Sequence, residues 1–232
     1  MDIYKAPVRD MLFALEAFDY EGRVATLPPY EMFDPETVEA ILQSSADVLQ
    51  NELLPLNKVG DAEGLKWDAE TGAVTTPTGF RDAYQTLMKN GMLGIGGPTE
   101  FGGGGAPEAL STVLGEMGTA TNKSFSMAPG LTRGLVDALY HHASDEQKAE
   151  YLPKLVSGEW TGTMCLTEPQ CGTDLGLVRT KAEPEGDHYR ISGTKIWITF
   201  GEHDMADNII HFVLARLPDA PEGIKGISVF IV

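Results

Sequence analysis

The chain of 232 residues has 42% hydrophobic and 22% charged residues, ordinary globular values that exclude disordered, collagen-like and coiled-coil chains. Its length suits one large domain or two small ones. The 34 acidic and 17 basic side chains give a formal net charge of −17. This charge disfavours nucleic acid and anionic membranes as partners, because both attract basic surfaces.

The cysteine content and the first residues both favour a reducing compartment. Only Cys165 and Cys171 are present, too few for a disulfide scaffold. Residues 1–7 carry charges and a proline where a signal peptide would have its apolar core. No apolar run approaches the roughly 18–20 residues that a membrane span needs. We therefore expect a soluble, cytoplasmic protein without a membrane span.

The first two-thirds of the chain shows helical periodicity. Asp34-Pro35 predicts a helix start, with Asp as the N-cap and Pro in the first turn. This helix is expected to end at Pro55. A loop rich in Gly, Asp and Thr is predicted over residues 60–79, and a second helix over residues 80–90, where apolar residues recur at helical spacing.

Two further helices are predicted after the glycine run at residues 102–105. Pro107 opens the first, and the capping box Ser144-Asp145-Glu146-Gln147 opens the second. The cluster Gly94-Ile95-Gly96-Gly97 lacks the final glycine spacing of a dinucleotide fingerprint, so we interpret it as structural. His141-His142 would point in different directions on a helix, which makes them a poor metal pair. No metal site is predicted.

After Trp160 the hydrophobic period changes from about 3.6 to 2, which is typical of β-strands. Gly186-Asp187 is a hairpin turn signal. Strands are expected at residues 177–182, 189–199, 209–215 and 226–232. We therefore predict an α+β fold, with a helical domain over residues 1–160 and an antiparallel, β-barrel-like domain over residues 161–232.

Residues 164–174 form the first of two segments that stand out. The segment leaves a strand and turns at Pro169, Gly172 permits close approach of a ligand, and Thr167 and Thr173 add hydroxyl groups. Exposed amides and hydroxyls in such a loop suit a phosphate or a ring carbonyl. A plain β-turn capped by Thr and Asp side chains explains the same residues.

Residues 193–201 form the second segment. Strand alternation would place Trp197 and Thr199 on one face and Ile196 and Ile198 on the other. A flat indole beside a hydroxyl fits an aromatic heterocycle, since the indole covers a ring face and the hydroxyl bonds an edge atom. A tryptophan of a β core next to a common strand threonine is the alternative.

Together these segments resemble the acyl-CoA dehydrogenase family of flavoproteins. Residues 167–174 match the family pattern Thr-Glu-Pro-x-x-Gly-Ser-Asp, with Thr173 in place of the usual serine. Trp197-Ile198-Thr199 matches the family's Trp-Ile-Thr. Residues 98–103 and 145–159 are similar to two further family segments. The resemblance runs from about residue 35 to the end of the chain.

Other segments resemble one branch of this family, the 3-methylmercaptopropionyl-CoA dehydrogenases and related larger enzymes. They are residues 4–11, 170–176, 201–205 and 217–223. The resemblance implies an FAD enzyme that removes two hydrogens from the α and β carbons of an acyl-CoA thioester, in fatty acid metabolism or in dimethylsulfoniopropionate degradation. A carboxylate base takes the α proton, and the β hydrogen goes to flavin N5 as hydride. An electron-transfer flavoprotein or similar acceptor and a homodimer or homotetramer are implied as partners.

The resemblance also implies which residues hold the cofactor. The FAD-binding positions carried over are Met164, Leu166, Thr167, Gly172, Thr173, Trp197, Ile198 and Thr199. Thr173 would also bind the CoA portion of the substrate, and Thr199 would lie near flavin N5. The acyl pocket would include residues 127–132. We interpret Glu168 as structural, and Cys171 as a compact loop residue rather than a redox centre.

No catalytic base is assigned in this chain. The family's base is a glutamate of a C-terminal helical domain, which the resemblance implies is missing here. Residues 227–232 read as an apolar strand, whereas chains usually end in polar residues, so the β domain is expected to be truncated. We expect this stretch alone to bind FAD weakly and to be inactive. The alternatives are an acyl-CoA oxidase or flavin monooxygenase on the same fold, and a non-catalytic fragment.

Overall fold

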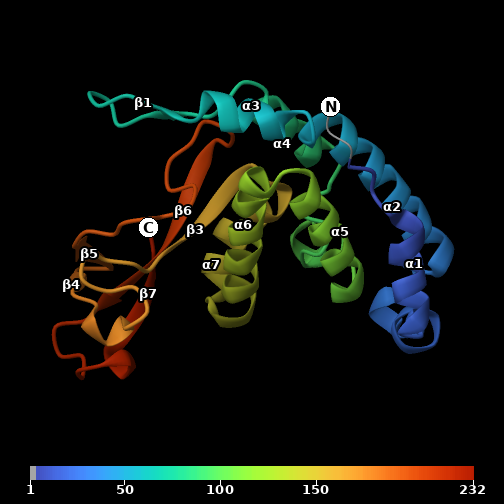
Figure 1. Ribbon diagram of the computed structural model, residues 1–232. Helices are drawn as coiled ribbons and strands as arrows, with labels where there is room; N and C mark the ends of the chain where they lie inside the picture. Colours follow the sequence, from blue (N-terminus) through green and yellow to red (C-terminus); the bar gives the residue numbers. More distant parts are fainter. Residues whose placement is uncertain (1–3) are drawn as a thin grey trace.

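The computed structural model describes residues 4–232. Part of residues 1–7, interpreted above as lacking a signal peptide, therefore lies outside the described residues. Helices occupy the first part of the chain and a sheet the second (Figure 1). The helices are α1 (Val8–Ala17), α2 (Pro35–Val48), α3 (Leu56–Glu63), α4 (Phe80–Lys89), α5 (Glu108–Thr121), α6 (Lys123–His142) and α7 (Asp145–Ser157). The strands are β1 (Lys66–Trp67), β2 (Val74–Thr75), β3 (Trp160–Cys165), β4 (Lys181–Glu185), β5 (His188–Ser192), β6 (Asn208–Arg216) and β7 (Ile227–Ile231).

The predicted helix starts are confirmed by their caps. The Asp34 carboxylate accepts a hydrogen bond of 2.8 Å from the Thr37 amide at the start of α2. Ser144 and Gln147 form both bonds of the capping box that opens α7, at 3.3 and 3.0 Å. These side chains satisfy amides that the first helical turn leaves without partners.

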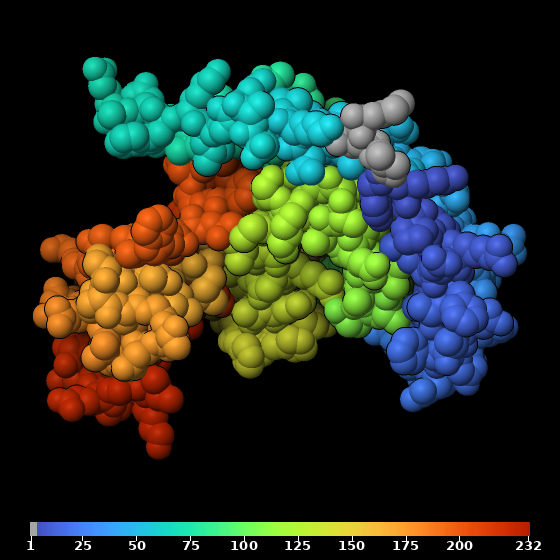
Figure 2. All heavy atoms as spheres, in the orientation of Figure 1, coloured from blue at the N-terminus to red at the C-terminus, as the bar shows by residue number. Residues whose placement is uncertain are grey.

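The helical run that begins at Pro35 ends just before Pro55, close to the expected end. The helix α2 continues into a π-helical turn over Leu49–Leu53, and Pro55 lies directly before α3. Proline is tolerated there because the first turn of a helix needs no amide donor from it. The loop predicted over residues 60–79 is only partly a loop, since these residues contain the end of α3 and the hairpin β1–β2. The hairpin projects beyond the helices in the space-filling view (Figure 2).

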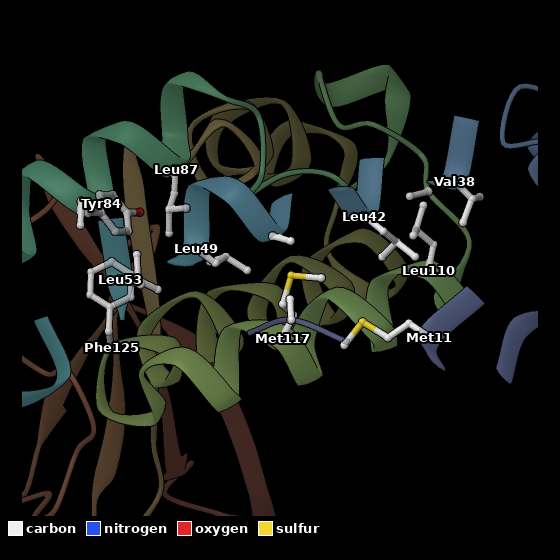
Figure 3. Packing of buried hydrophobic residues seen from close by; sticks show 14 of the residues in the cluster. Met11, Val38, Leu42, Leu49, Leu53, Tyr84, Leu87, Leu110, Met117 and Phe125 are labelled. Atoms are coloured by element: carbon white, nitrogen blue, oxygen red, sulfur yellow. The ribbon is translucent and has the colours of Figure 1, made fainter. Parts of the chain in front are cut away.

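The core of the helical part is formed where α2, α4, α5 and α6 meet (Figure 3). Leu42, Leu110 and Phe125 are completely shielded from solvent. Tyr84 is buried as well, and its hydroxyl donates a 2.8 Å hydrogen bond to the Gly158 carbonyl. A second apolar cluster lies between α6, α7 and the sheet. Because burial of apolar side chains is the main favourable term in folding, these clusters hold the helices in place.

The cluster Gly94-Ile95-Gly96-Gly97 serves backbone packing. It lies against the glycine run, where a Cβ on Gly103 would stand 2.2 Å from the Gly97 carbonyl and one on Gly104 would stand 2.6 Å from the Ile95 carbonyl. Only glycine allows backbones to approach so closely. The packing agrees with the structural interpretation of this cluster.

The sheet is mixed, which corrects the prediction of an antiparallel domain. Its order is β3-β6-β4-β5, with β7 also paired to β6. β3 and β6 run parallel, from Trp160 opposite Asn208 to Cys165 opposite Val213. β4–β5 and β6–β7 are antiparallel. Parallel pairing is possible because the connection from β3 to β6 is long and includes the β4–β5 hairpin.

The helical domain is followed by this sheet domain, as predicted for the fold class. α6 and α7 lie between the sheet and the other helices (Figure 1). Among residues 4–232, no helix is both long and apolar enough to cross a lipid bilayer.

Candidate functional site

The two unusual sequence segments meet beyond the end of β3. The Ile196 amide donates a 2.9 Å hydrogen bond to the Thr167 carbonyl. The Lys195 ammonium donates a 3.0 Å bond to the Leu166 carbonyl. The structure thus brings together two loops that are separated by about 20 residues of chain, although neither loop belongs to a regular strand at the contact.

Glu168 holds this junction together. Its buried carboxylate accepts hydrogen bonds from the Arg179 amide at 2.8 Å, from the Thr180 amide at 3.0 Å and from the Thr180 hydroxyl at 2.6 Å. Lys195 forms an ion pair with it at 2.9 Å, and Gln170 donates a further bond. Every one of these contacts is with a neighbouring protein group.

The same contacts set the ionisation of Glu168. Burial by itself raises the pKa of this carboxyl, but the hydrogen bonds from Thr180, Arg179 and Lys195 outweigh burial and hold the pKa at about 2. The carboxylate is therefore ionised at neutral pH and hydrogen-bonded to these three residues. A general base needs free access to a substrate proton, so Glu168 is structural, as predicted.

Cys171 completes a tight turn with Glu168. The Glu168 amide bonds the Cys171 carbonyl at 2.8 Å, and the reverse bond is 3.0 Å long. The Cys171 side chain is buried, in agreement with a compact loop residue. Gly172 follows without a strained backbone, and an added Cβ would make only an ordinary 3.4 Å contact with Thr167.

The strand predicted over residues 189–199 ends early. β5 stops at Ser192, and Trp197 has a left-handed backbone with φ of +59°. The prediction that Trp197 and Thr199 share one strand face, opposite Ile196 and Ile198, is therefore wrong. The chain leaves the sheet because Gly193 packs against Thr180, where a Cβ would stand 2.3 Å from the hydroxyl. Lys195 is then held by Glu168 rather than by a strand partner.

The eight predicted cofactor positions lie along this junction. Met164, Thr173 and Trp197 are exposed, and the other five are partly buried: Leu166, Thr167, Gly172, Ile198 and Thr199. Within residues 4–232, no hydrogen bond links Thr173 to the 195–199 segment. The loop end that carries Thr173 is instead stabilised by Asp174, which accepts a 3.0 Å bond from the Gly176 amide.

The junction fits a flat aromatic group. Trp197 is 86% exposed and Met164 is 40% exposed, so each of the two segments leaves a large apolar side chain in water. The same segments carry the threonine hydroxyls at positions 167 and 199. Covering such surfaces with a planar ring removes apolar area from water. Because Gly172 has no side chain, a polar part of the same ligand can approach its backbone.

Sequence reasoning missed a polar row on β3. The Thr161 hydroxyl lies 2.9 Å from His203 Nε2, and the Thr163 hydroxyl lies 2.7 Å from His211 Nδ1. Cys165 Sγ is 3.7 Å from the same His211 atom. Burial lowers the pKa of His203 and, likewise, that of His211. The alternation of Thr161, Thr163 and Cys165 along the strand is a signal of this row in the sequence. The histidines that the threonines contact, however, lie more than 40 residues further along the chain.

A cavity of about 520 Å³ lies between α5, α6 and the loop at residues 92–97. Five of the six residues 127–132 line it: Met127, Pro129, Gly130, Leu131 and Thr132. The Ser111 hydroxyl is buried at its wall and has no hydrogen-bond partner among the described residues. Within residues 4–232, no group of three or more His, Cys, Asp and Glu side chains is placed to hold a metal ion.

Comparisons with known proteins agree over nearly the whole chain. The family model "Acyl-CoA dehydrogenase, N-terminal domain" matches residues 35–159, and "Acyl-CoA dehydrogenase, middle domain" matches residues 163–232. The 3-methylmercaptopropionyl-CoA dehydrogenase of Ruegeria pomeroyi is 44% identical over 230 residues, which cover 99% of this chain and 39% of that protein.

Solved structures show the same relationship. An acyl-CoA dehydrogenase from Geobacillus kaustophilus matches with a TM-score of 0.70 and 26% identity, over 85% of this chain and 48% of that one. The acyl-CoA dehydrogenase of Bacillus anthracis, complexed with FAD, matches with a TM-score of 0.65 and 25% identity, over 84% of this chain and 30% of that one. The chain spans less than half the length of each of these relatives. Because the two family models together match most of its residues, the chain belongs to the acyl-CoA dehydrogenase family.

Proposed function

We propose that the protein binds FAD and removes two hydrogens from the α and β carbons of an acyl-CoA thioester. The observation that carries the proposal is the junction of residues 164–174 with residues 195–199, which leaves Trp197 exposed beside polar backbone and hydroxyl groups. The FAD bound in the Bacillus anthracis relative supports the choice of cofactor. FAD, when bound, supplies the acceptor for the β hydrogen.

Residues at the junction would bind and orient the cofactor. In the proposal, Met164, Leu166 and Thr167 lie along the flavin, and Trp197 covers part of it. Ile198 would also lie against the isoalloxazine, and Thr199 would lie near N5. Gly172 and Thr173 approach the phosphate side, and Thr173 also contacts the CoA portion of the substrate. The absence of a side chain at Gly172 and the exposure of Thr173 support this assignment.

The proposal assigns no catalytic base to these 232 residues. Glu168 follows the cofactor position Thr167 directly in the sequence, but its oxygens bond Thr180, Arg179 and Lys195. A carboxylate held in this way does not accept a substrate proton. Its role is to orient the loop that meets the cofactor.

The apolar cavity beside α6 is the proposed acyl site. Its lining includes Met127 and Leu131 and matches the position expected for the acyl pocket. The relative from Ruegeria pomeroyi supports 3-methylmercaptopropionyl-CoA as the substrate. We also propose a helical domain over residues 1–160, a β domain over residues 161–232, a homodimer or homotetramer, and an electron-transfer flavoprotein or similar acceptor for the reduced flavin.

A substrate screen on the purified full-length protein tests the proposal. We expect a flavin absorption spectrum that bleaches anaerobically with 3-methylmercaptopropionyl-CoA and recovers with an electron-transfer flavoprotein or a dye acceptor. A protein without flavin absorbance, or one that no acyl-CoA bleaches, would contradict it. Bleaching by straight-chain acyl-CoA thioesters alone would contradict the proposed substrate. Rapid reoxidation of the reduced flavin by oxygen, with release of peroxide, would identify an oxidase.

A further inference from the structure

Two residues in the segment proposed to meet the flavin have a strained backbone. Trp197 and Phe200 both have left-handed conformations, with φ of +59° and +52°. Bulky L-residues rarely adopt this region because the side chain crowds the backbone. Such conformations persist only where surrounding contacts determine them. The contacts that hold residues 197–200 are therefore part of the site.

Contacts on the N-terminal side fix only the start of the segment. Ile196 and Lys195 are bonded to the loop after β3, as described above. Trp197 itself is exposed and does not anchor the chain. The Gly201 amide bonds the Ile198 carbonyl at 3.1 Å, which closes a turn but leaves its direction open. Phe200 packs against the core of the helical part, and its ring centroid lies 5.8 Å from that of His203. Residues after 201 add to this constraint.

Residues 203–205 are held from two sides. The His203 ring lies 2.9 Å from the Thr161 hydroxyl of β3. The Asp204 carboxylate accepts a 3.0 Å bond from the Thr76 amide and a 2.6 Å bond from the Thr76 hydroxyl. Met205 is 1% exposed and belongs to the core of the helical part. In Figure 1 the loop before β6 reaches the helices next to the β1–β2 hairpin.

The Asp204 contact is a charged one. Burial raises the pKa of Asp204, but the bonds from Thr76 and the nearby charge of Arg81 outweigh this and lower the pKa below its ordinary value. The ionised carboxylate therefore makes charge-assisted hydrogen bonds, which are shorter and more directional than neutral ones. Gln85 of α4 adds a 3.2 Å bond to the Met205 carbonyl.

We propose that Asp204, through Thr76, and His203, through Thr161, are positioning residues that hold Trp197 and Phe200 in their left-handed conformations. The helical domain would thereby set the orientation of Trp197 and Thr199 on the face that receives the cofactor. The role in cofactor binding rests on the proposed function. The backbone constraint itself does not require FAD to be present.

Hydrogen exchange separates positioning from general stabilisation. We would compare Asp204→Ala with Asp34→Ala in the flavin-free full-length protein. Asp34 also accepts a bond from a threonine amide, but at the exposed start of α2. Positioning predicts that exchange in residues 195–201 becomes about tenfold faster with Asp204→Ala and stays unchanged with Asp34→Ala. Equal exchange in the two variants would overturn the proposal.

Conservative variants provide the rescue and the safeguard. Asp204→Asn keeps the oxygen that accepts from Thr76 and should restore slow exchange in residues 195–201. If Asp204→Ala does not fold, Thr76→Val removes only the hydroxyl donor and should give the same local acceleration. If Asp204→Asn folds but its exchange in residues 195–201 stays fast, the result counts against the proposal.

An FAD titration distinguishes the two proposals. If the parent protein binds no FAD, the proposed function fails, whereas the backbone constraint is still judged by exchange. If Asp204→Ala accelerates exchange yet binds FAD with the parent's affinity and visible spectrum, the positioning role is overturned and the proposed function stands. We expect about tenfold weaker FAD binding, which corresponds to about 1.4 kcal/mol.

Discussion

Replacing Glu168 by glutamine tests whether this residue stabilises the junction as an anion. The buried carboxylate forms an ion pair with Lys195 and accepts bonds from Arg179 and Thr180. Its pKa of about 2 lies well below 4.5, the ordinary value for a glutamate. Because one pKa unit corresponds to about 1.4 kcal/mol, ionisation of Glu168 contributes about 3 kcal/mol to the folded state.

The sign of the pH dependence follows from the lowered pKa. A carboxyl with a lower pKa in the folded state stabilises the protein above the unfolded pKa, and this stability is lost as pH falls from 4.5 toward 2. Glu168→Gln should therefore lose about 3 kcal/mol at neutral pH. The difference from the parent should shrink as the pH is lowered through this window.

Urea unfolding followed by circular dichroism at a series of pH values measures this effect. Glu183→Ala is a matched control, since Glu183 is exposed on β4 and its removal should change stability by less than about 0.5 kcal/mol. If the difference between Glu168→Gln and the parent is the same at neutral pH and near pH 3, where about 2 kcal/mol of it should be lost, the reasoning from ionisation is wrong. A stability loss no larger than that of the control would refute it as well.

Three further changes test the site and the fold. Trp197→Ala should leave the melting temperature unchanged, because the side chain is 86% exposed, but should weaken FAD binding about tenfold in a fluorescence titration; unchanged affinity would remove the indole from the site. Ser144→Ala should cost about 1 kcal/mol in thermal unfolding through loss of the capping box, and an unchanged melting temperature would contradict that role. Gly103→Ala should cost about 1–3 kcal/mol, since its Cβ would meet Gly97 at 2.2 Å. Its control Gly115→Ala has open space and should be neutral or stabilising by about 0.5–1 kcal/mol; equal effects of the two would argue against the close packing.

Local hydrogen bonding explains the predictions that the structure confirms. Asp34 and Ser144 bond amides three residues away, so their caps can be recognised in a short window of sequence. The turn at residues 168–171 is likewise closed within four residues. In each case the partner lies in the same stretch of chain as the residue that identifies the pattern.

Long-range contacts explain the predictions that are wrong. Residues 193–199 have the composition of a strand, but Gly193 packs on Thr180 and Lys195 is bound by Glu168. Composition measures how well a residue fits a pleated surface, and tertiary contacts override it. The parallel pairing of β3 with β6 also depends on the path of the intervening chain, which a strand pattern does not contain.

The sequence by itself determined the α+β order, the helix caps and the two motifs that identify the family. Tertiary structure alone decided how these motifs work together. It joined Thr167 to Ile196, buried the carboxylate of Glu168, and tied Asp204 to Thr76 across 128 residues of sequence. The physical reason is that motif residues follow from local chemistry, whereas the left-handed backbone of Trp197 needs contacts from distant parts of the chain to outweigh its strain.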